Sequence, residues 1–167
     1  MGIETEYGLL YASTTTGEQL LDPEETAHHL FEPLLHKARS TNAFLPNGAR
    51  LYLDVGAHPE YATAECDQLA DLLANDRAGD ALYAQMAAEA EVKLSGGRMH
   101  LFKNNLDSYG NSFGCHENYL VRRRRDFRQR IDGLIPYFVT RQIMVGAGYL
   151  HVLSLIHISE PTRRYAI

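Results

Sequence analysis

The chain has 167 residues, of which 45% are hydrophobic and 22% are charged, an ordinary composition for one globular domain with a buried core. Its net charge of −5 argues against general nucleic-acid binding, which needs an excess of lysine and arginine. No apolar run approaches the length of a membrane span, so the sequence predicts no nucleic acid and no membrane as partner.

Two further features favour a cytoplasmic location. The N-terminus is an acidic, strand-like segment and not the basic and then apolar pattern of a secretory leader. Cys66 and Cys115 are the only cysteines, which is typical of free thiols in a reducing compartment. We therefore expect a protein that stays in the cytoplasm.

The first predicted element is a strand over residues 2–8, where polar and apolar residues alternate. Because side chains two residues apart in a strand share a face, Glu4 and Glu6 should lie together. A helix is predicted to follow, with Asp22 as its N-cap, Pro23 at its first position and Glu25 as capping-box partner. Pro33 should kink or shorten this helix.

Two more charged strands follow a turn at Asn47-Gly48. Alternation over residues 50–54 puts Arg50, Tyr52 and Asp54 on one face, and residues 58–65 form the next strand. Carboxylates lined along strands repel one another unless cations neutralise them, and hard divalent cations with oxygen ligands do so. Phosphates bridge to the same cations, so the pattern predicts a metal–nucleotide site built on a sheet.

The second half of the chain mixes helices and strands. Residues 67–94 predict one helix, or two with a break near Gly79, whose buried side holds Leu69, Leu72, Leu73, Leu82 and Met86. Residues 98–103 and 113–121 predict two strands that pair as a hairpin around a polar loop. A last helix over residues 126–145 should bury Phe127, Ile131, Leu134, Ile135 and Phe138.

These elements predict an α+β fold, in which helices pack on one face of a sheet. The strands are too few to complete a large sheet, so the fold looks truncated. Residues 153–167 fit nothing before them, and the run from Leu153 to Arg163 resembles the translation of a sequencing adapter. We therefore expect residues 1–152 to be the N-terminal part of a catalytic domain and residues 153–167 to be a non-native tail.

Five motifs in order resemble the Pup–protein ligase family (proteasome accessory factor A), a branch of the glutamine-synthetase-like carboxylate–amine ligases. The motifs occupy residues 1–8, 47–56, 58–67, 102–105 and 114–120. The resemblance implies part of a glutamine-synthetase-like antiparallel sheet. It also implies an ATP-dependent reaction in which the side-chain carboxylate of the C-terminal glutamate of Pup is phosphorylated. A lysine of a protein substrate then attacks, and the product is marked for a bacterial proteasome.

The resemblance further implies ATP and Mg²⁺ as cofactors, with Pup and lysine-bearing proteins as partners. By similarity, Glu4, Tyr52 and Glu60 would lie at the magnesium site, while Arg50 and Thr63 would contact ATP. Asp54 would be the general base that deprotonates the incoming lysine. Strict alternation puts Glu60 and Thr63 on opposite faces of a strand, so both reach one nucleotide only if the strand bends or bulges, or if they contact different parts of the nucleotide.

Other functions remain open beside the ligase. The same fold serves the Pup deamidase/depupylase and other ATP-dependent carboxylate–amine ligases, although the short segment between the first strand and residue 47 favours the ligase branch. A hypothesis of another class is a non-catalytic, truncated binding fragment.

Four groups of side chains have open roles. Glu6 is either a metal ligand or the partner of an arginine. Glu117 is either a metal or nucleotide contact, or forms a buried pair with His116. The basic cluster Arg122–Arg125 suits a solvated loop, nucleic acid or acidic Pup, and Lys103-Asn104-Asn105 is a weak candidate for a phosphate cradle.

Overall fold

The computed structural model describes residues 1–38, 40–107, 110–145, 149–150 and 157–158. The chain forms two compact units, the first made of Met1–Asn104 with Phe113–Tyr119 and the second of Asn105–Ser112 with Leu120–Ile167. All six residues with a predicted site role belong to the first unit. Its elements are β1 (Gly2–Glu6), β2 (Gly8–Ser13), α1 (Pro23–Ala38), β3 (Asn42–Phe44), β4 (Arg50–Asp54), β5 (His58–Ala62), α2 (Leu69–Lys93), β6 (Gly97–Phe102) and β7 (Cys115–Asn118).

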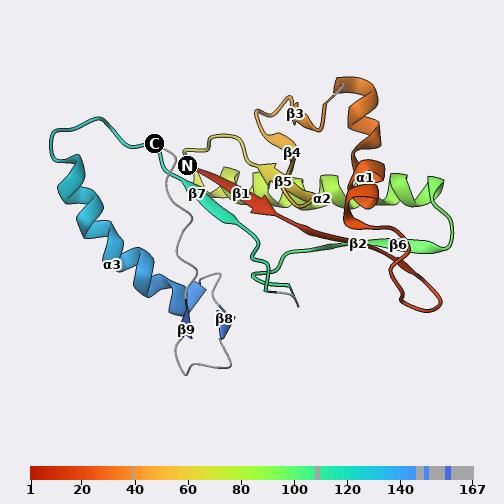
Figure 1. Ribbon diagram of the computed structural model, residues 1–167. Helices are drawn as coiled ribbons and strands as arrows, with labels where there is room; N and C mark the ends of the chain where they lie inside the picture. Colours follow the sequence, from red (N-terminus) through yellow and green to blue (C-terminus); the bar gives the residue numbers. More distant parts are fainter. Residues whose placement is uncertain (39, 108–109, 146–148, 151–156, 159–167) are drawn as a thin grey trace. The chain divides into compact units, whose positions relative to one another are not determined.

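The main sheet of the first unit has the strand order β3-β4-β5-β1-β7, and each pair of neighbours is antiparallel. Strand β2 continues the line of β1 after Tyr7 and pairs with β6 (Figure 1). The predicted antiparallel sheet is therefore confirmed.

The predicted hairpin between residues 98–103 and 113–121 is wrong. Strand β6 pairs with β2, and β7 pairs with β1, so the two strands belong to different sheets. The reason is that β1 and β2 form one long N-terminal run, and each later strand pairs with a different stretch of it.

Helix α1 begins as predicted, because Oδ1 of Asp22 accepts a hydrogen bond of 2.8 Å from the backbone N–H of Glu25. Pro33 does not shorten the helix, which continues to Ala38. Leu30 and Phe31 are fully buried, and this packing offsets the hydrogen bond that proline cannot make.

Helix α2 is continuous over Leu69–Lys93, so of the two alternatives that the sequence left open the single helix is confirmed and the break near Gly79 is not found. Gly79 instead lets the helix approach the sheet, since a Cβ at this position would lie 2.5 Å from Cδ1 of Tyr61. The predicted buried side is also wrong in part, because Leu69 and Leu73 are 79% and 57% exposed. The residues that α2 buries are Leu72, Gly79, Tyr83, Met86, Ala87 and Ala90.

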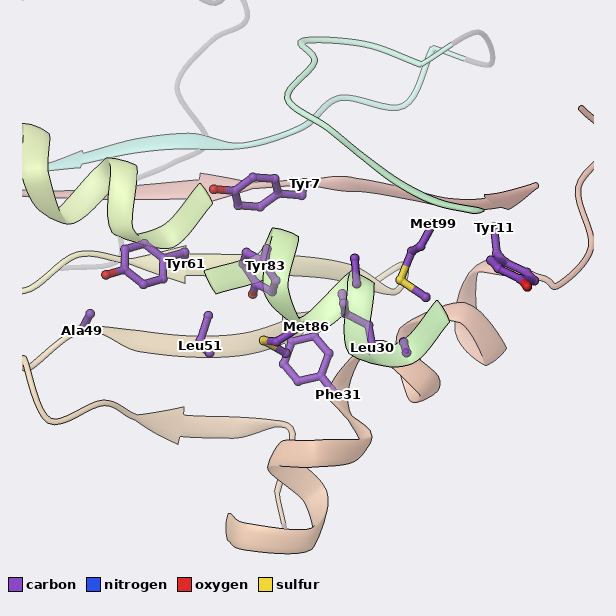
Figure 2. Close-up of a cluster of buried hydrophobic side chains, with 12 residues drawn as sticks. Tyr7, Tyr11, Leu30, Phe31, Ala49, Leu51, Tyr61, Tyr83, Met86 and Met99 are labelled. Atoms are coloured by element: carbon purple, nitrogen blue, oxygen red, sulfur yellow. The ribbon is translucent and has the colours of Figure 1, made fainter. Parts of the chain in front are cut away.

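The core lies between the two helices and one face of the strands. Figure 2 shows Leu51 of β4, Tyr61 of β5 and Tyr7, which lies between β1 and β2, gathered around Tyr83 of α2. The rings of Tyr7 and Tyr83 lie 4.9 Å apart, and the Tyr83 hydroxyl donates a 2.7 Å hydrogen bond to the backbone carbonyl of Glu60. Because successive strand residues point to opposite faces, this packing leaves the other face of the sheet for polar side chains.

The second unit holds α3 (Phe127–Val145) and the short antiparallel pair β8 (Tyr149–Leu150) and β9 (His157–Ile158). The predicted buried stripe of α3 is wrong for Phe127, Leu134 and Ile135, which are 47%, 41% and 49% exposed. Apart from β9, the predicted non-native tail lies outside the described residues. None of the helices in the described ranges is long and apolar enough to cross a membrane.

Candidate functional site

The predicted site residues of β1, β4 and β5 meet on the face of the main sheet that points away from the core. Glu6 lies directly across from Glu60, and Glu60 lies directly across from Tyr52. Glu4 lies two residues before Glu6 on β1, and Arg50 lies two residues before Tyr52 on β4. Both are cross-strand partners of Ala62 on β5. We call this surface the acidic face; it holds Glu4, Glu6, Arg50, Tyr52, Asp54, His58 and Glu60.

Glu60 is the most buried acid of this face, with an exposed fraction of 3%. Burial raises the pKa of Glu60 above its ordinary value, and the charges of Glu6, Asp54 and Glu4 raise it further. A hydrogen bond with Tyr52 acts in the opposite direction. The ionised form of Glu60 is therefore destabilised in this structure unless a positive charge comes close.

The hydroxyl pKa of Tyr52 is shifted by the same surroundings. Burial and the hydrogen bond to Glu60 raise the pKa of its hydroxyl well above the ordinary range, so the phenol keeps its proton. The guanidinium of Arg50 lies 4.2 Å from the centre of the Tyr52 ring, and its Nε donates a 2.8 Å hydrogen bond to Oδ1 of Asn42. Arg50 is thus held over an aromatic ring at the acidic face.

Glu4 lies near the β7 side of the face and is joined to that strand. Nδ1 of His116 lies 2.9 Å from Oε2 of Glu4, and Nδ2 of Asn118 donates to Oε1 at 3.4 Å. Glu117 is the cross-strand partner of Ile3, so its side chain points to the other face. Its predicted contact with the metal site is not supported, and His116 takes that place beside Glu4.

Asp54 is the last residue of β4, is exposed, and lies directly across from His58. A tight turn of residues 55–57 joins the two strands. Gly56 and Ala57 both have positive φ angles, 88° and 61°. A left-handed alanine is uncommon and persists only where its surroundings impose it.

Thr63 follows the end of β5 and leaves the regular ladder. Its backbone N–H donates to the carbonyl of Ile3 at 2.9 Å, but the N–H of Ile3 donates at 3.0 Å to the Thr63 hydroxyl oxygen. The side chain therefore lies beside the backbone of β1, and the hydroxyl retains its own proton for donation. This departure from the ladder occurs where a bend or bulge was one of the two alternatives left open by the sequence, the other being that Glu60 and Thr63 contact different parts of the nucleotide.

Lys103, at the start of the predicted phosphate cradle, does not join the acidic face. Its Nζ lies 2.7 Å from Oδ1 of Asp80 and 3.5 Å from Oδ1 of Asp76, both on α2. The Tyr7 hydroxyl donates to the same Asp80 oxygen at 2.7 Å. Lys103 therefore ties α2 to the strands on the core side.

Comparison with known proteins decides the family. A family model described as "Pup-ligase protein" matches residues 1–167. The chain belongs to the Pup-ligase family. The Pup–protein ligase of Nakamurella multipartita is 53% identical over 152 residues, which cover 89% of this chain and 33% of the relative. The ligase of Renibacterium salmoninarum is 52% identical over 154 residues, covering 90% of this chain and 33% of that protein.

Solved structures agree with the Pup-ligase assignment and with the predicted fold. The chain resembles the crystal structure of the complex between the prokaryotic ubiquitin-like protein Pup and its ligase PafA, with 49% identity and a TM-score of 0.83. That match covers 90% of this chain and 30% of the other. A structure of PafA in complex with ADP matches with a TM-score of 0.62, covering 82% and 30%. The chain thus spans about a third of the length of the curated relatives it matches.

The acidic face of this Pup-ligase chain holds carboxylates that could serve as ligands of a magnesium ion. In the described ranges, no three or more histidine, cysteine, aspartate or glutamate side chains are grouped as a ready-made metal cage. Magnesium is ordinarily held by one or two carboxylates together with waters and substrate phosphates. Glu4 and Glu60 could supply such carboxylates, and burial together with the smaller effect of the neighbouring acids raises the pKa of Glu60.

Sequence reasoning missed His58 of the acidic face, and it missed His116 and Asn118 of β7, which contact Glu4. His58 lies in the quoted motif of residues 58–67, and its alternation with Glu60 was a sufficient signal to place it on this face. His116 and Asn118 reach Glu4 only through the pairing of β1 with β7. The sequence contains no local signal for that register, because the two strands are far apart in the chain.

Proposed function

We propose that this chain provides the magnesium–ATP face of a Pup–protein ligase, which joins the C-terminal glutamate side chain of Pup to lysines of protein substrates. The observation that carries the proposal is the shared face of Glu4, Tyr52 and Glu60, with Asp54 at its end. Membership of the Pup-ligase family and relatives solved with Pup and with ADP support it. Since the chain spans about a third of its relatives, the activity is proposed for the whole protein.

The chemistry explains the residue types. A carboxylate is a poor electrophile, so the γ-phosphoryl group of ATP is first transferred to the Pup glutamate, which gives an acyl phosphate and ADP. The lysine amine then attacks the acyl carbon, the isopeptide bond forms, and inorganic phosphate leaves. An ammonium group is not nucleophilic, and the Asp54 carboxylate takes the proton that lysine must lose.

The remaining roles concern binding and orientation. Glu4, Tyr52 and Glu60 would hold Mg²⁺, which would supply positive charge beside the phosphate oxygens during phosphoryl transfer. The Arg50 guanidinium, held over Tyr52, faces the same surface and suits contact with ATP phosphates. The Thr63 hydroxyl retains a proton for donation to the nucleotide. We place the reaction in the cytoplasm, as expected for a chain with only two cysteines, Cys66 and Cys115.

A chimeric enzyme tests this function. Residues 1–152 of this chain replace the matching third of the Nakamurella multipartita ligase, and attachment of Pup to a lysine substrate is followed with Mg²⁺ and ATP. The chimera should ligate Pup, and Asp54→Asn should slow ligation by about 10²–10⁴-fold while ATP still binds. Glu65→Asn is a matched control, because Glu65 is exposed beyond the end of β5. Unchanged ligation by Asp54→Asn would remove Asp54 from the base role.

A further inference from the structure

Glu6 is the acid of this face whose contacts differ most from the sequence expectation. One of its carboxylate oxygens contacts Nδ1 of His58, and the other accepts a hydrogen bond from the backbone N–H of Gly114. Its side chain is 11% exposed, against 30% for Glu4. Glu6 therefore connects β1 with β5 and with the segment before β7, and its partner is a histidine, not an arginine.

His58 is held on its other sides as well. Its ring stacks on that of Phe113, with centroids 4.7 Å apart and planes 24° apart. The ring also lies against the β4–β5 turn, since a Cβ at Gly56 would be 3.6 Å from Nε2 of His58. Directly across the two strands from His58 lies Asp54. Because the His58 ring is held in place by these contacts, it restricts the conformation of the adjoining turn of residues 55–57.

We infer that Glu6 and His58 form a positioning pair that fixes the β4–β5 turn and, through it, the carboxylate of Asp54. The left-handed Ala57 in this turn is consistent with a conformation imposed by its surroundings. The inference rests on the proposed function, because it assumes that Asp54 is the base. In this arrangement Glu6 acts through His58, while Glu4 and Glu60 face the nucleotide.

Three substitutions separate the hydrogen bond from the ring. His58→Phe keeps an aromatic ring for Phe113 but removes the donor to Glu6. His58→Asn keeps a donor near the place of Nδ1 but removes the ring. His28→Phe is the matched control, because His28 is exposed on α1, outside the acidic face.

The first readout is kinetic and uses the chimera with Mg²⁺, ATP, Pup and a lysine substrate. His58→Phe should lower kcat by about 10–100-fold with an unchanged KM for ATP, as is usual when an orienting partner is lost. His58→Asn should recover most of the rate, and His28→Phe should match the unsubstituted chimera. A raised KM for ATP in His58→Phe at unchanged kcat, or no recovery in His58→Asn, would overturn the inference.

The second readout needs no catalysis. In the 167-residue chain, amide hydrogen exchange over residues 55–57 should be faster in His58→Phe and unchanged in His58→Asn and His28→Phe. Unchanged exchange in His58→Phe would overturn the positioning role. The Asp54→Asn chimera distinguishes a failure of the positioning role from a failure of the proposed function. If Asp54→Asn is inactive while His58→Phe is fully active, only the positioning role of Glu6 and His58 is refuted. If Asp54→Asn is fully active, the proposed function itself fails.

Discussion

The side chains of Tyr52 and Glu60 meet directly across β4 and β5, and a hydrogen bond joins the phenol to a carboxylate that is only 3% exposed. This pair lies on the face opposite the aromatic core, surrounded by further acids. A structure that served stability alone would not concentrate carboxylates around a buried one. The pair is therefore the centre of the acidic face and the first target for experiment.

The raised pKa of Glu60 predicts a pH dependence of stability in the absence of Mg²⁺. The ordinary pKa of a glutamate side chain is 4.5, and folding raises that of Glu60. Such a group contributes most to stability at a pH below 4.5. The contribution is lost as the pH rises through the raised pKa. Glu60→Gln should remove that loss, so the substituted chain should gain stability relative to the original as the pH approaches neutrality. Urea unfolding at a series of pH values measures this difference, and parallel curves for the two chains would contradict it.

Asp80 should show the opposite sign. Burial opposes its ionisation, but hydrogen bonds from Lys103 and Tyr7 hold the pKa of Asp80 below its ordinary value of 3.8. Its stabilising contribution is present above 3.8 and is lost as the pH falls through the lowered pKa. Asp80→Asn should therefore flatten the loss of stability in acid. Urea unfolding over the same series of pH values provides the test. If Asp80→Asn loses stability in acid as steeply as the original chain does, the stabilising role of the Asp80 contacts with Lys103 and Tyr7 is contradicted.

Gly79 should not tolerate a side chain despite its place in a helix. Alanine has the higher helix propensity by about 1 kcal/mol, but its Cβ would meet the buried ring of Tyr61 at 2.5 Å. Overpacking costs about 1–3 kcal/mol, so Gly79→Ala should lower the free energy of unfolding. Gly133→Ala is the control, because a Cβ there meets nothing within 4 Å. Thermal unfolding followed by circular dichroism decides the matter, and equal midpoints for both variants would refute the close packing of α2.

The 167-residue chain alone should not ligate Pup. Its matched segment spans 33% of the Nakamurella multipartita relative, and a single sheet face supplies only one side of a nucleotide site. Purified chain, Mg²⁺, ATP, Pup and a lysine substrate should give no isopeptide product on a gel that resolves the conjugate. ATP-dependent attachment of Pup under these conditions would show that the chain is sufficient for the reaction.

Local patterns predicted much of the fold and nearly all of the acidic face. Period-two alternation placed Glu4 with Glu6 and Tyr52 with Asp54, and capping chemistry placed the start of α1 at Asp22. Alternation sets the face of a side chain within a strand, so these predictions needed no knowledge of strand partners.

The errors arose where distant parts of the chain meet. The partners of β6 and β7 depend on β1 and β2, about a hundred residues earlier in the chain. The close packing of Gly79 against the ring of Tyr61 is likewise a contact between distant residues, which helix propensity does not predict. The contact of His116 with Glu4 follows from the pairing of β1 with β7. The pairing of strands that are far apart in the sequence therefore could not be predicted from the sequence alone.

The central claim is that Glu4 and Glu60 bind one magnesium–ATP complex on a shared face. Calorimetric titration of the chimera with ATP in the presence of Mg²⁺ tests it, with Glu4→Gln, Glu60→Gln and the control Glu65→Gln, whose glutamate is exposed beyond β5. We expect each of the first two substitutions to weaken ATP binding by at least about tenfold, while Glu65→Gln leaves it unchanged. Equal affinity in all three variants would contradict it.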